Sequence, residues 1–443
     1  MNSSRRNFLT KIGGGTAAAL AAPTVLNAQN RSKLAPSDQV NIAVVGVRDI
    51  GWANLRSHLQ IPGVNCVALC DVDQRELDKR VSDVEKMAGN RPETYTDFRK
   101  LYERPDLDAV ILGTPDHWHA IQSIQACEAG LDVYVEKPLA NSIEECQVMA
   151  DAVKKHNRIV QVGQQQRSSD HWQPAMKLIR DGKIGRVNFV RAWNHSGPSR
   201  IVQPKPDIAT PPEVDYKMWL GPAPERPFNE NRFHGSFRWY WDYAGGKMTD
   251  WGVHLIDMVL LGMGATAPKS VMASGGKFAD PGSDMETPDT MNAVYEFDDF
   301  VMVWEHNMIN PKGPYDKDHG IEFVGEQGRM IIDRRGWEII PVTERAEDGS
   351  SRYVMEKMPY QPRRGNPRDA HAVDFINSIK TREQPICPIE IGSHVAVVAH
   401  LGNISYRLGR KAYWDSDSYA FKDDAEAQKM VQAQYHNGWE LSV

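Results

Sequence analysis

The sequence predicts an α/β fold in two parts. The N-terminal part is a doubly wound parallel sheet, and the C-terminal part is an α+β domain with an open, largely antiparallel sheet. Between residues 40 and 162, short apolar runs alternate with amphipathic stretches of helical spacing, which is typical of βαβ units. After about Gly163, apolar and polar residues largely alternate along the short runs. Strands with one solvated face show this pattern.

The expected elements follow from these patterns. A helix carrying Trp52, Leu55 and Leu59 at helical spacing should follow the first strand. A Pro-rich, aromatic segment over 198–241 is too long for a simple connector and predicts a functional loop. The expected strands are 40–45, 66–70, 109–112, 132–135 and 159–162 in the first part and 187–193, 291–297, 301–304 and 321–324 in the second, with helices near 172–180 and 394–408.

Length and composition limit the function. With 443 residues, of which 41% are hydrophobic and 25% charged, the chain can bury a large core and form two domains. The net charge of -6 argues against nucleic acid and anionic membrane as partners. We expect no membrane association of the mature form, and a homo-oligomer. The predicted division is 1–28 signal peptide, 29–38 linker, and two domains over 39–163 and 164–443.

The N-terminus predicts export. Arg5 and Arg6 precede a stretch from Ile12 to Asn30 without charged residues, and Ala28 ends a candidate cleavage site. This arrangement is typical of a twin-arginine signal, which places the protein in the periplasm or outside the cell. The alternative is an uncleaved membrane anchor, but glycines and Pro23 make a poor spanning helix.

The cysteines predict neither disulfides nor a metal site. There are five, an odd number, and none forms a CxxC pair. Cargo of the twin-arginine route folds in the reducing cytosol before export, which favours buried free thiols.

A dinucleotide site is predicted after the first strand. Gly46 and Gly51 stand where a dinucleotide fingerprint needs glycines for the tight turn and for helix packing, although Arg48 replaces the middle glycine. Asp71 follows 25 residues after Gly46 at the end of the next strand, where a carboxylate would bind a ribose and repel a 2'-phosphate. We therefore expect NAD, with NADP possible because Arg48 or Arg75 would soften that preference.

Two further segments make the prediction specific. Gly113-Thr114-Pro115-Asp116-His117-Trp118-His119-Ala120 follows one strand, and Tyr134-Val135-Glu136-Lys137-Pro138-Leu139 ends the next. With its TP-x-x-x-H segment and E-K-P tripeptide, the chain resembles the glucose-fructose oxidoreductase and inositol dehydrogenase (Gfo/Idh/MocA) family over residues 40–443.

The resemblance implies a role for Lys137, which would reach both the nicotinamide and the reacting hydroxyl. An ammonium there stabilises a developing alkoxide; the alternative is an exposed lysine at a strand end. Gln165 and Arg167 would face the cleft between the domains. The expected cofactor-binding residues are Gly46, Arg48, Gly51, Asp71, Thr114, Pro115, His117, His119, Glu136, Lys137 and Gln165.

A second cluster predicts an acid-base group. If residues 250–257 are helical, Asp250, His254 and Asp257 share one face. His254 would be the catalytic base, with Asp250 fixing its tautomer, as the family's D-x-x-x-H pair implies. Alternatively, Asp250 caps a helix and His254 is a core residue; Asp257 is expected to be structural. The expected catalytic residues are Lys137, His254 and Asp250, and the substrate-binding residues are Arg167, Trp241, Asp250 and His254.

Together these features predict an NAD(P)-dependent oxidoreductase that transfers a hydride between a sugar or cyclitol hydroxyl and its cofactor. No free nicotinamide pool exists outside the cytosol, so the cofactor should be tightly held and recycled in the site. The second candidate is an NAD-dependent glycoside hydrolase that uses transient oxidation and elimination. The hydrolases of this family commonly depart from E-K-P, which this chain keeps. A noncatalytic sugar-binding protein or sensor is third.

We predict that replacing Arg5 and Arg6 by Lys traps the precursor in the cytosol, because the export machinery recognises the paired arginines. Immunoblotting of periplasmic and cytosolic fractions measures the effect. Unchanged export of that variant would indicate another route.

Overall fold

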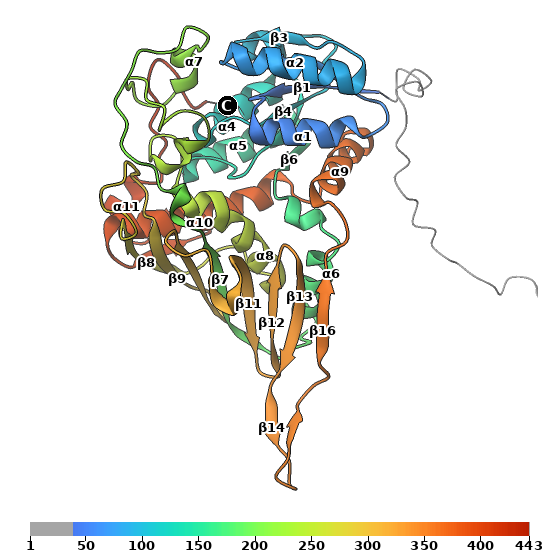
Figure 1. Cartoon of the computed structure of the whole chain (residues 1–443), viewed down its shortest axis with the longest axis vertical. Helices are drawn as coiled ribbons and strands as arrows, with labels where there is room; N and C mark the ends of the chain where they lie inside the picture. Colours follow the sequence, from blue (N-terminus) through green and yellow to red (C-terminus); the bar gives the residue numbers. More distant parts are fainter. Residues whose placement is uncertain (1–38, 443) are drawn as a thin grey trace, which may run out of the picture.

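The N-terminal half of the chain forms a six-stranded parallel sheet. A computed structural model describes residues 39–442. The sheet has the order β3-β2-β1-β4-β5-β6, and all its neighbouring strands are parallel. Its central strands are apolar on both faces because helices cover both (Figure 1). The strands are β1 Val40–Val45, β2 Val64–Cys70, β3 Glu93–Tyr95, β4 Ala109–Leu112, β5 Asp132–Val135 and β6 Val160–Val162; the helices are α1 Asp49–Leu59, α2 Gln74–Ala88, α3 Phe98–Tyr102, α4 His119–Glu128 and α5 Ile143–His156.

Side-chain caps fix where several of these helices begin. Asp73 accepts a hydrogen bond from the Arg75 N–H at the start of α2, and Ser142 accepts one from the Glu145 N–H at the start of α5. These contacts satisfy N–H groups that have no partner within the helix. The α2 cap holds a loop beside the cofactor site, as described below.

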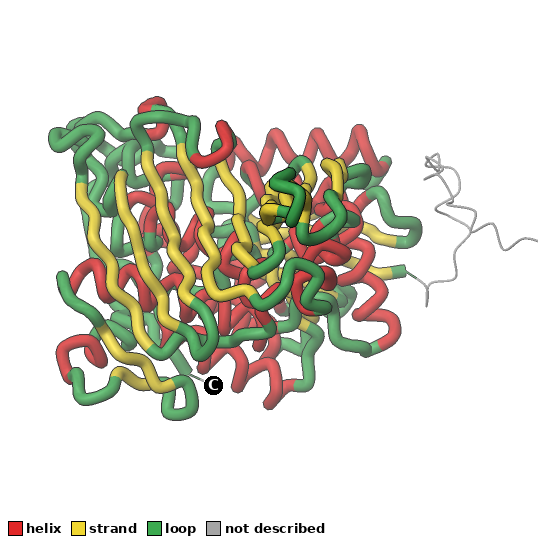
Figure 2. The backbone as a smooth tube through the Cα atoms, turned by 90° about the horizontal axis from the view of Figure 1, so that it is seen from below, coloured by secondary structure: helices red, strands yellow, loops and turns green. Residues whose placement is uncertain are grey.

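The second half forms a ten-stranded sheet in the order β16-β13-β12-β11-β7-β10-β9-β8-β17-β18. The pair β7 and β10 is parallel and the other pairs are antiparallel. Buried and exposed residues alternate along β9, and Figure 2 shows the strands as a broad layer with helices behind it. The strands are β7 Val187–His195, β8 Ser270–Gly276, β9 Thr290–Glu296, β10 Val301–Asn307, β11 His319–Gly325, β12 Gly328–Asp333, β13 Gly336–Pro341, β16 Met358–Pro362, β17 Ala412–Asp415 and β18 Ala420–Phe421.

Helices pack on one face of this sheet and complete the core. The helices that do so are α6 Trp172–Arg180, α8 Val253–Met263 and α10 Ile389–Leu408; the other helices of this part of the chain are α7 Tyr216–Leu220, α9 Pro367–Thr381 and α11 Ala425–Lys429. Apolar residues of α6, α8 and α10 share one buried cluster with residues of β7 to β12. A hairpin of β14 Thr343–Arg345 and β15 Ser351–Tyr353 projects from the far end of the sheet (Figure 1).

Helix α9 returns to the N-terminal sheet, far from its place in the sequence. Phe375 and Ile376 are buried in the same apolar cluster as Leu55 and Leu59 of α1, and Figure 1 shows α9 beside α1. The segment predicted as the second domain, 164–443, thus contributes one helix to the core of the first.

The loop over 198–241 packs against the edge of the first domain. The Asp215 N–H donates to the Val72 carbonyl (2.9 Å), and the Gln74 N–H donates to the Glu213 carbonyl (3.0 Å). Its aromatic side chains form a small core of their own. The predicted functional loop is therefore ordered against the start of α2.

Most predicted elements are present. The five predicted strands of the parallel sheet, the four of the second sheet and both of its helices are confirmed. The strands β3, β14, β15 and β16 were not predicted, because they are short or polar on the surface. The strands β8, β12, β13, β17 and β18 were not predicted either. All five cysteines are free and buried, as predicted.

The remaining predictions concern the N-terminal segments, membrane-spanning helices and metal sites. The predicted signal peptide 1–28 and linker 29–38 lie outside the described residues. Within residues 39–442, no helix has the length and apolar character needed to span a bilayer. In the same range, no group of histidine, cysteine and carboxylate side chains is arranged to hold a metal ion.

We predict that Phe375→Ala lowers the free energy of unfolding by about 3–5 kcal/mol, because this fully buried ring joins α9 to α1. Urea titration followed by circular dichroism measures the change. Val373→Ala on the same helix, where the side chain is 43% exposed, is the control and should change stability by less than about 0.5 kcal/mol. Equal effects of both substitutions would contradict the packing.

Candidate active site

A cavity of about 320 Å³ lies at the carboxyl ends of the parallel strands and extends to α8 and β12 of the second half. Ligands of doubly wound sheets bind at this edge. Its walls combine the predicted dinucleotide residues with the predicted catalytic ones. The lining includes Gly46, Arg48, Asp71, Gly113, Thr114, Pro115, Asp116, Glu136, Lys137, Gln165, Trp219, Phe233, Arg238, Asp250, Trp251, His254, Arg334 and Arg368.

The turn after β1 is built on three closely packed glycines. Gly46 has a φ of +80°, and a Cβ on it would lie 2.7 Å from the Gly113 carbonyl carbon. A Cβ on Gly51 would lie 1.9 Å from the Gly46 oxygen. Only glycine permits these approaches, which bring the start of α1 against the ends of β1 and β4. Arg48 begins α1, where no such contact excludes a side chain, so the missing middle glycine of the fingerprint leaves the turn intact.

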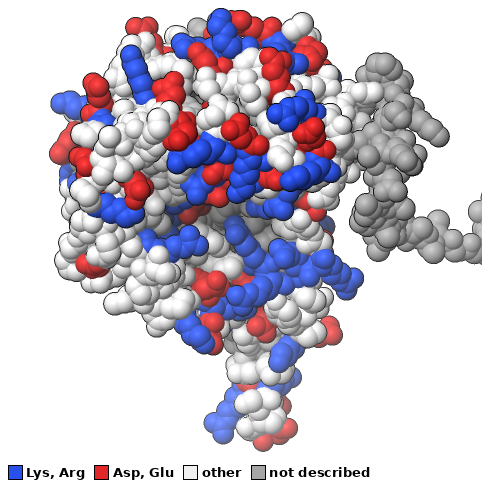
Figure 3. Space-filling model, turned by 45° about the horizontal axis from the view of Figure 1, so that its top comes forward, with Lys and Arg blue, Asp and Glu red and all other residues white. Residues whose placement is uncertain are grey.

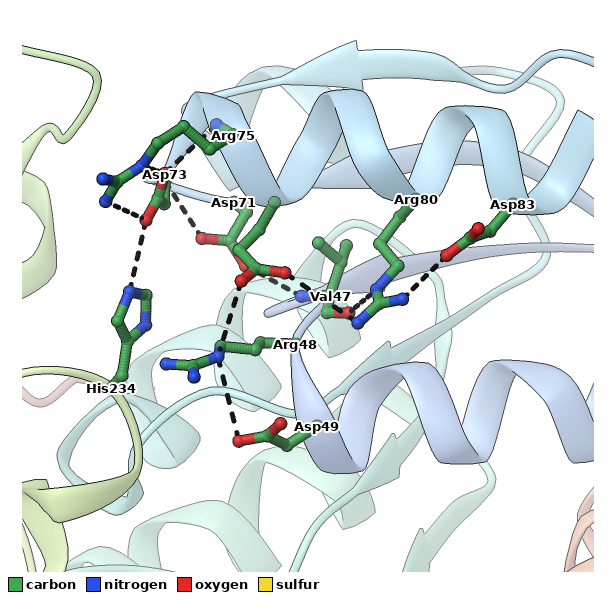
Figure 4. Close-up of polar contacts among 10 residues, drawn as sticks. Val47, Arg48, Asp49, Asp71, Asp73, Arg75, Arg80, Asp83 and His234 are labelled. Atoms are coloured by element: carbon green, nitrogen blue, oxygen red, sulfur yellow. Dashed lines mark hydrogen bonds and ion pairs between the residues drawn. The ribbon is translucent and has the colours of Figure 1, made fainter.

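Asp71 lies beside this turn at the end of β2. Its carboxylate accepts hydrogen bonds from the Val47 N–H (2.9 Å) and the Asp73 N–H (3.0 Å), as Figure 4 shows. Burial raises the pKa of Asp71 to about 6, although these two hydrogen bonds lower it. The group is therefore mostly ionised at neutral pH and retains lone pairs for a ligand.

Three basic side chains near Asp71 already lie beside other carboxylates. Arg75 makes two hydrogen bonds to Asp73 (2.9 and 2.8 Å), and His234 Nε2 lies 3.2 Å from the same carboxylate (Figure 4). His234 belongs to the long loop, so Asp73 connects that loop to α2. Arg48 lies 3.5 Å from Glu76. Because Arg75 is paired, it does not offer a free charge to a 2'-phosphate.

These residues fit NAD. The residues at the start of α1 line the cavity beside Gly46, where the N-terminus of a helix would bind a pyrophosphate, and Asp71 lines the same cavity, where it would bind a ribose. Thr114 and Pro115 continue the wall, and the Thr114 hydroxyl donates to Gln122 (2.7 Å).

The two predicted motif segments are connected through His119. One ring nitrogen lies 2.8 Å from the Pro138 oxygen and the other 3.0 Å from the Thr114 oxygen. His117 lies 3.1 Å from the Trp219 oxygen. Both histidines are buried, and neither of these predicted cofactor-binding residues lines the cavity; their contacts hold the wall together. Burial lowers the pKa of each to about 4.

Glu136 supports the same wall from below. Its carboxylate accepts hydrogen bonds from Asn54 of α1 (2.8 Å) and from the Lys137 N–H (3.1 Å). Burial raises its pKa. The following peptide bond, between Lys137 and Pro138, is cis.

Lys137 and Asp250 form an ion pair between the two halves. Lys137 Nζ donates to Asp250 Oδ1 (2.8 Å) and to the Asp250 carbonyl oxygen (3.0 Å). Burial would raise the pKa of Asp250, but Lys137 and Arg238 outweigh it and hold the pKa well below its usual range. One N–H of the ammonium remains for a ligand.

His254 lines the cavity beside this pair. Burial lowers the pKa of His254 well below its ordinary value, and Arg334 and Lys137 lower it further, so the imidazole is neutral. Its Nδ1 is buried and has no hydrogen-bond partner among the described residues. Gln166 donates to the His254 carbonyl (3.0 Å) and so holds the first turn of α8.

The predicted hydrogen-bonded pair of Asp250 and His254 is not formed. Residues Met248–Gly252 are a π-helical turn, which changes the spacing between the two side chains from that of an α-helix. Asp250 binds Lys137 instead, and among residues 39–442 no hydrogen bond joins its carboxylate to the imidazole. Both side chains still line the same cavity.

Two predicted substrate contacts lie elsewhere. Arg167 forms a buried ion pair with Asp257, with 2.6 Å between Nη2 and Oδ1, and so joins the segment after β6 to α8. Asp257 is structural, in keeping with its prediction. Trp241 donates to the Glu286 carbonyl (3.1 Å) and packs against Tyr406. Neither Arg167 nor Trp241 lines the cavity, whereas Gln165 does.

Several lining residues were not predicted. Arg238 lies 3.5 Å from Asp250, Trp251 contacts Arg334, and burial raises the pKa of the lining carboxyl Asp116 to about 7. Arg238 stands in the aromatic segment 198–241 that was predicted to be a functional loop, and Asp116 and Trp251 stand inside segments already recognised as motifs. Their neighbours in the sequence therefore indicated this region. Arg334 follows β12, where the sequence has no recognised motif, so nothing in the sequence indicated it.

We predict that Asp71→Ala weakens NAD binding by roughly 10- to 100-fold, because hydrogen bonds to a charged group are lost, and shifts the relative preference toward NADP. In the unsubstituted protein, NAD affinity should fall as the pH drops through about 6, where Asp71 becomes protonated. Calorimetry between pH 5 and 8 measures both effects, and Asp71→Ala should lose the pH dependence. A tenfold preference of the original protein for NADP would contradict the ribose assignment.

Comparison with known proteins agrees with this geometry. A family model described as an oxidoreductase family with an NAD-binding Rossmann fold matches residues 40–164. A second, described as the C-terminal alpha/beta domain of that oxidoreductase family, matches residues 188–285. Together they cover about half of the chain.

Three individual relatives share 20% to 29% sequence identity with this chain over the matched residues. An alpha-N-acetylgalactosaminidase of Shewanella oneidensis is 29% identical over 205 residues, which span 42% of this chain and 44% of that protein. A levoglucosan dehydrogenase solved with NADH and levoglucosan has a TM-score of 0.62 at 20% identity, covering 84% of this chain and 98% of that one. A myo-inositol 2-dehydrogenase of Lactobacillus plantarum has a TM-score of 0.61 at 21% identity, covering 85% and 99%.

The structural likeness shows a shared fold, and the two family models match consecutive domains in the expected order. The N-terminal part is therefore an NAD-binding Rossmann domain, and the chain belongs to the Gfo/Idh/MocA oxidoreductase family.

Proposed function

We propose that this protein uses NAD to oxidise a hydroxyl of a sugar or cyclitol, with Lys137 and His254 acting on that hydroxyl. The observation that carries the proposal is the single cavity that joins the glycine turn after β1 to Lys137, Asp250 and His254. The chemistry that NAD supplies when bound is the acceptance of a hydride from a carbon that bears a hydroxyl.

Lys137 is suited to stabilising the reacting oxygen. Two of its three N–H groups are held by Asp250, which fixes the direction of the third. An ammonium positioned in advance stabilises negative charge that develops on the hydroxyl oxygen. Asp250 thus acts on the substrate through Lys137.

His254 is suited to accepting the hydroxyl proton. Its lowered pKa keeps the imidazole neutral at physiological pH, which is the state a base requires. The lowered pKa also makes His254 a weaker base. The nearby carboxylate of Asp250 partly offsets this effect, because it favours the protonated imidazole. Aromatic side chains of the long loop, including Trp219 and Phe233, line the same cavity and would exclude water.

The expected export supports a retained cofactor. Because no nicotinamide pool is present outside the cytosol, we propose that the folded enzyme leaves with NAD bound. Two sugars would then exchange a hydride in turn. Mass spectrometry of the enzyme purified from the periplasm tests this, since a protein without dinucleotide would contradict it.

A second function is favoured by the curated relatives. The matched Shewanella protein is named as a glycosidase, and transient oxidation of a ring carbon makes elimination of a glycosidic substituent easier. The proposed oxidation is the first step of that route too. The retained E-K-P segment of this chain ranks the oxidoreductase first.

Product analysis separates these functions. An oxidoreductase should change the nicotinamide absorbance at 340 nm with monosaccharides or cyclitols and leave 4-nitrophenyl α-N-acetylgalactosaminide intact. A hydrolase should release nitrophenol from that glycoside without net oxidation. A noncatalytic sensor would bind sugars and do neither, which would contradict both enzymatic proposals.

We predict that His254→Ala lowers kcat by roughly 10²- to 10⁴-fold, the usual loss when a positioned acid-base group is removed, while NAD affinity is unchanged. Steady-state kinetics and calorimetry measure the two quantities. His436→Ala, at an exposed histidine, is the control and should retain full activity. Near-complete activity of His254→Ala would exclude His254 as the base.

A further inference from the structure

Arg334 carries a partly buried guanidinium that has no carboxylate partner among the described residues. It follows β12, and its side chain lines the cavity beside His254. Its Nε donates to Gln166 (2.9 Å), and its guanidinium lies 4.4 Å from the centre of the Trp251 ring. Its Nη2 is buried and has no hydrogen-bond partner, and among residues 39–442 no carboxylate lies within ion-pair distance of Arg334. By contrast, the buried Arg167 is neutralised by Asp257.

The turn between β12 and β13 holds Arg334 in place. The Asp333 carboxylate accepts hydrogen bonds from the Arg335 N–H (2.7 Å) and the Gly336 N–H (3.1 Å). The Arg334 N–H donates to His319 Nε2 (3.3 Å). An unpaired buried charge is costly, and burial lowers the pKa of Arg334 to about 10. A ligand that brings a negative charge would remove this cost.

A smaller cavity of about 140 Å³ adjoins this position and shares Gln165, Arg334 and Arg368 with the main one. No Asp or Glu stands among its lining residues within the described chain. Figure 3 shows basic side chains gathered around the hollow between the two halves. The lining residues are Gln165, Gln166, Ser169, His171, Trp172, Arg334, Arg363, Asn366, Pro367 and Arg368.

The smaller cavity is lined by two further arginines, Arg363 and Arg368. The loop that carries them is also held in place. The Asp170 carboxylate accepts hydrogen bonds from the Arg364 N–H (2.9 Å) and the Gly365 N–H (3.1 Å). Asn366 caps α9 by accepting from the Arg368 N–H (3.2 Å). Arg368 therefore stands in the first turn of a helix whose N-terminus itself favours anions.

These charges are separate from the position of the cofactor phosphates. The pyrophosphate site lies at the start of α1, beside Gly46 and Arg48, whereas Arg334 contacts Gln166 and Trp251 at the catalytic end. The carboxylate of Asp250 is already bound by Lys137. A guanidinium binds a carboxylate or sulfate through parallel N–H groups.

We propose that the substrate is an acidic sugar whose carboxylate or sulfate ester binds between Arg334 and Arg368, at the junction of the two cavities. This rests on the function proposed above, because it names the class of sugar that the same site takes. The anion would fix which hydroxyl faces Lys137 and His254.

Calorimetry on the NAD-bound enzyme tests the proposal. The probes are glucuronate and galacturonate, glucose 6-sulfate and galactose 6-sulfate, and the neutral parents glucose and galactose. At least one acidic sugar should bind at least tenfold more tightly than its neutral parent. Arg334→Gln should weaken that binding by roughly 10- to 100-fold, because a charged hydrogen-bonded contact is lost. The uronates and the sulfate esters distinguish the two kinds of anion.

Arg334→Gln also loses the contacts with Gln166 and Trp251, so a second variant is needed. Arg368→Gln serves this purpose and should weaken binding of the acidic sugar similarly. Arg335→Gln is the matched control, because Arg335 is the exposed neighbour of Arg334; it should bind as the original protein does. Higher salt should weaken only the acidic sugars.

The outcomes separate this inference from the proposed oxidation. Equal binding of acidic and neutral sugars, no binding of any acidic sugar, or full affinity in the folded Arg334 and Arg368 variants would overturn the anion site. Arginine-dependent binding without any change in nicotinamide absorbance would support the anion site and contradict the oxidation. Oxidation of neutral sugars that is independent of both arginines would support the oxidation and contradict the anion site.

Discussion

The ion pair of Lys137 and Asp250 is the contact on which the active site depends. Lys137 follows β5 of the parallel sheet, and Asp250 belongs to the π-helical turn before α8. Both side chains are largely removed from water, so without Asp250 the Lys137 ammonium would lose its only carboxylate contact among residues 39–442, whereas Asp250 would keep the weaker contact with Arg238. The pair therefore fixes the spacing of the two halves at the place where substrate and cofactor must meet. It also directs the remaining N–H of the ammonium.

The rest of the cavity wall supports this arrangement from both sides. Below it, the close contact of Gly46 with Gly113 brings the cofactor turn to the sheet edge. Above it, the long loop is connected to the first domain through His234 and Asp73. The oxidoreductase and the glycosidase need the same first proton and hydride transfers, so this wall serves either reaction.

Electrostatics divides the cavity into two regions. At the cofactor end, the basic Arg75 is neutralised by Asp73. At the catalytic end, Lys137 and Arg238 contact the carboxylate of Asp250, whose pKa they hold well below its usual range, while burial raises the pKa of Asp116 to about 7. In the proposed reaction, this positive charge would stabilise an oxygen that becomes negative, and it is the basis for the proposed anionic substrate.

The sequence by itself determined the parallel sheet and the residues at its edge, because buried strands are continuous apolar runs and the motif residues follow them directly. Tertiary structure alone decided what those residues contact. Arg167, Trp241 and His117 were expected at the ligand, yet each is held by a partner 45 to 102 residues away. The π-helical turn redirected Asp250 from His254 to Lys137, and α9 returned to the first domain. Such pairings depend on long-range packing, which no local pattern of residues records.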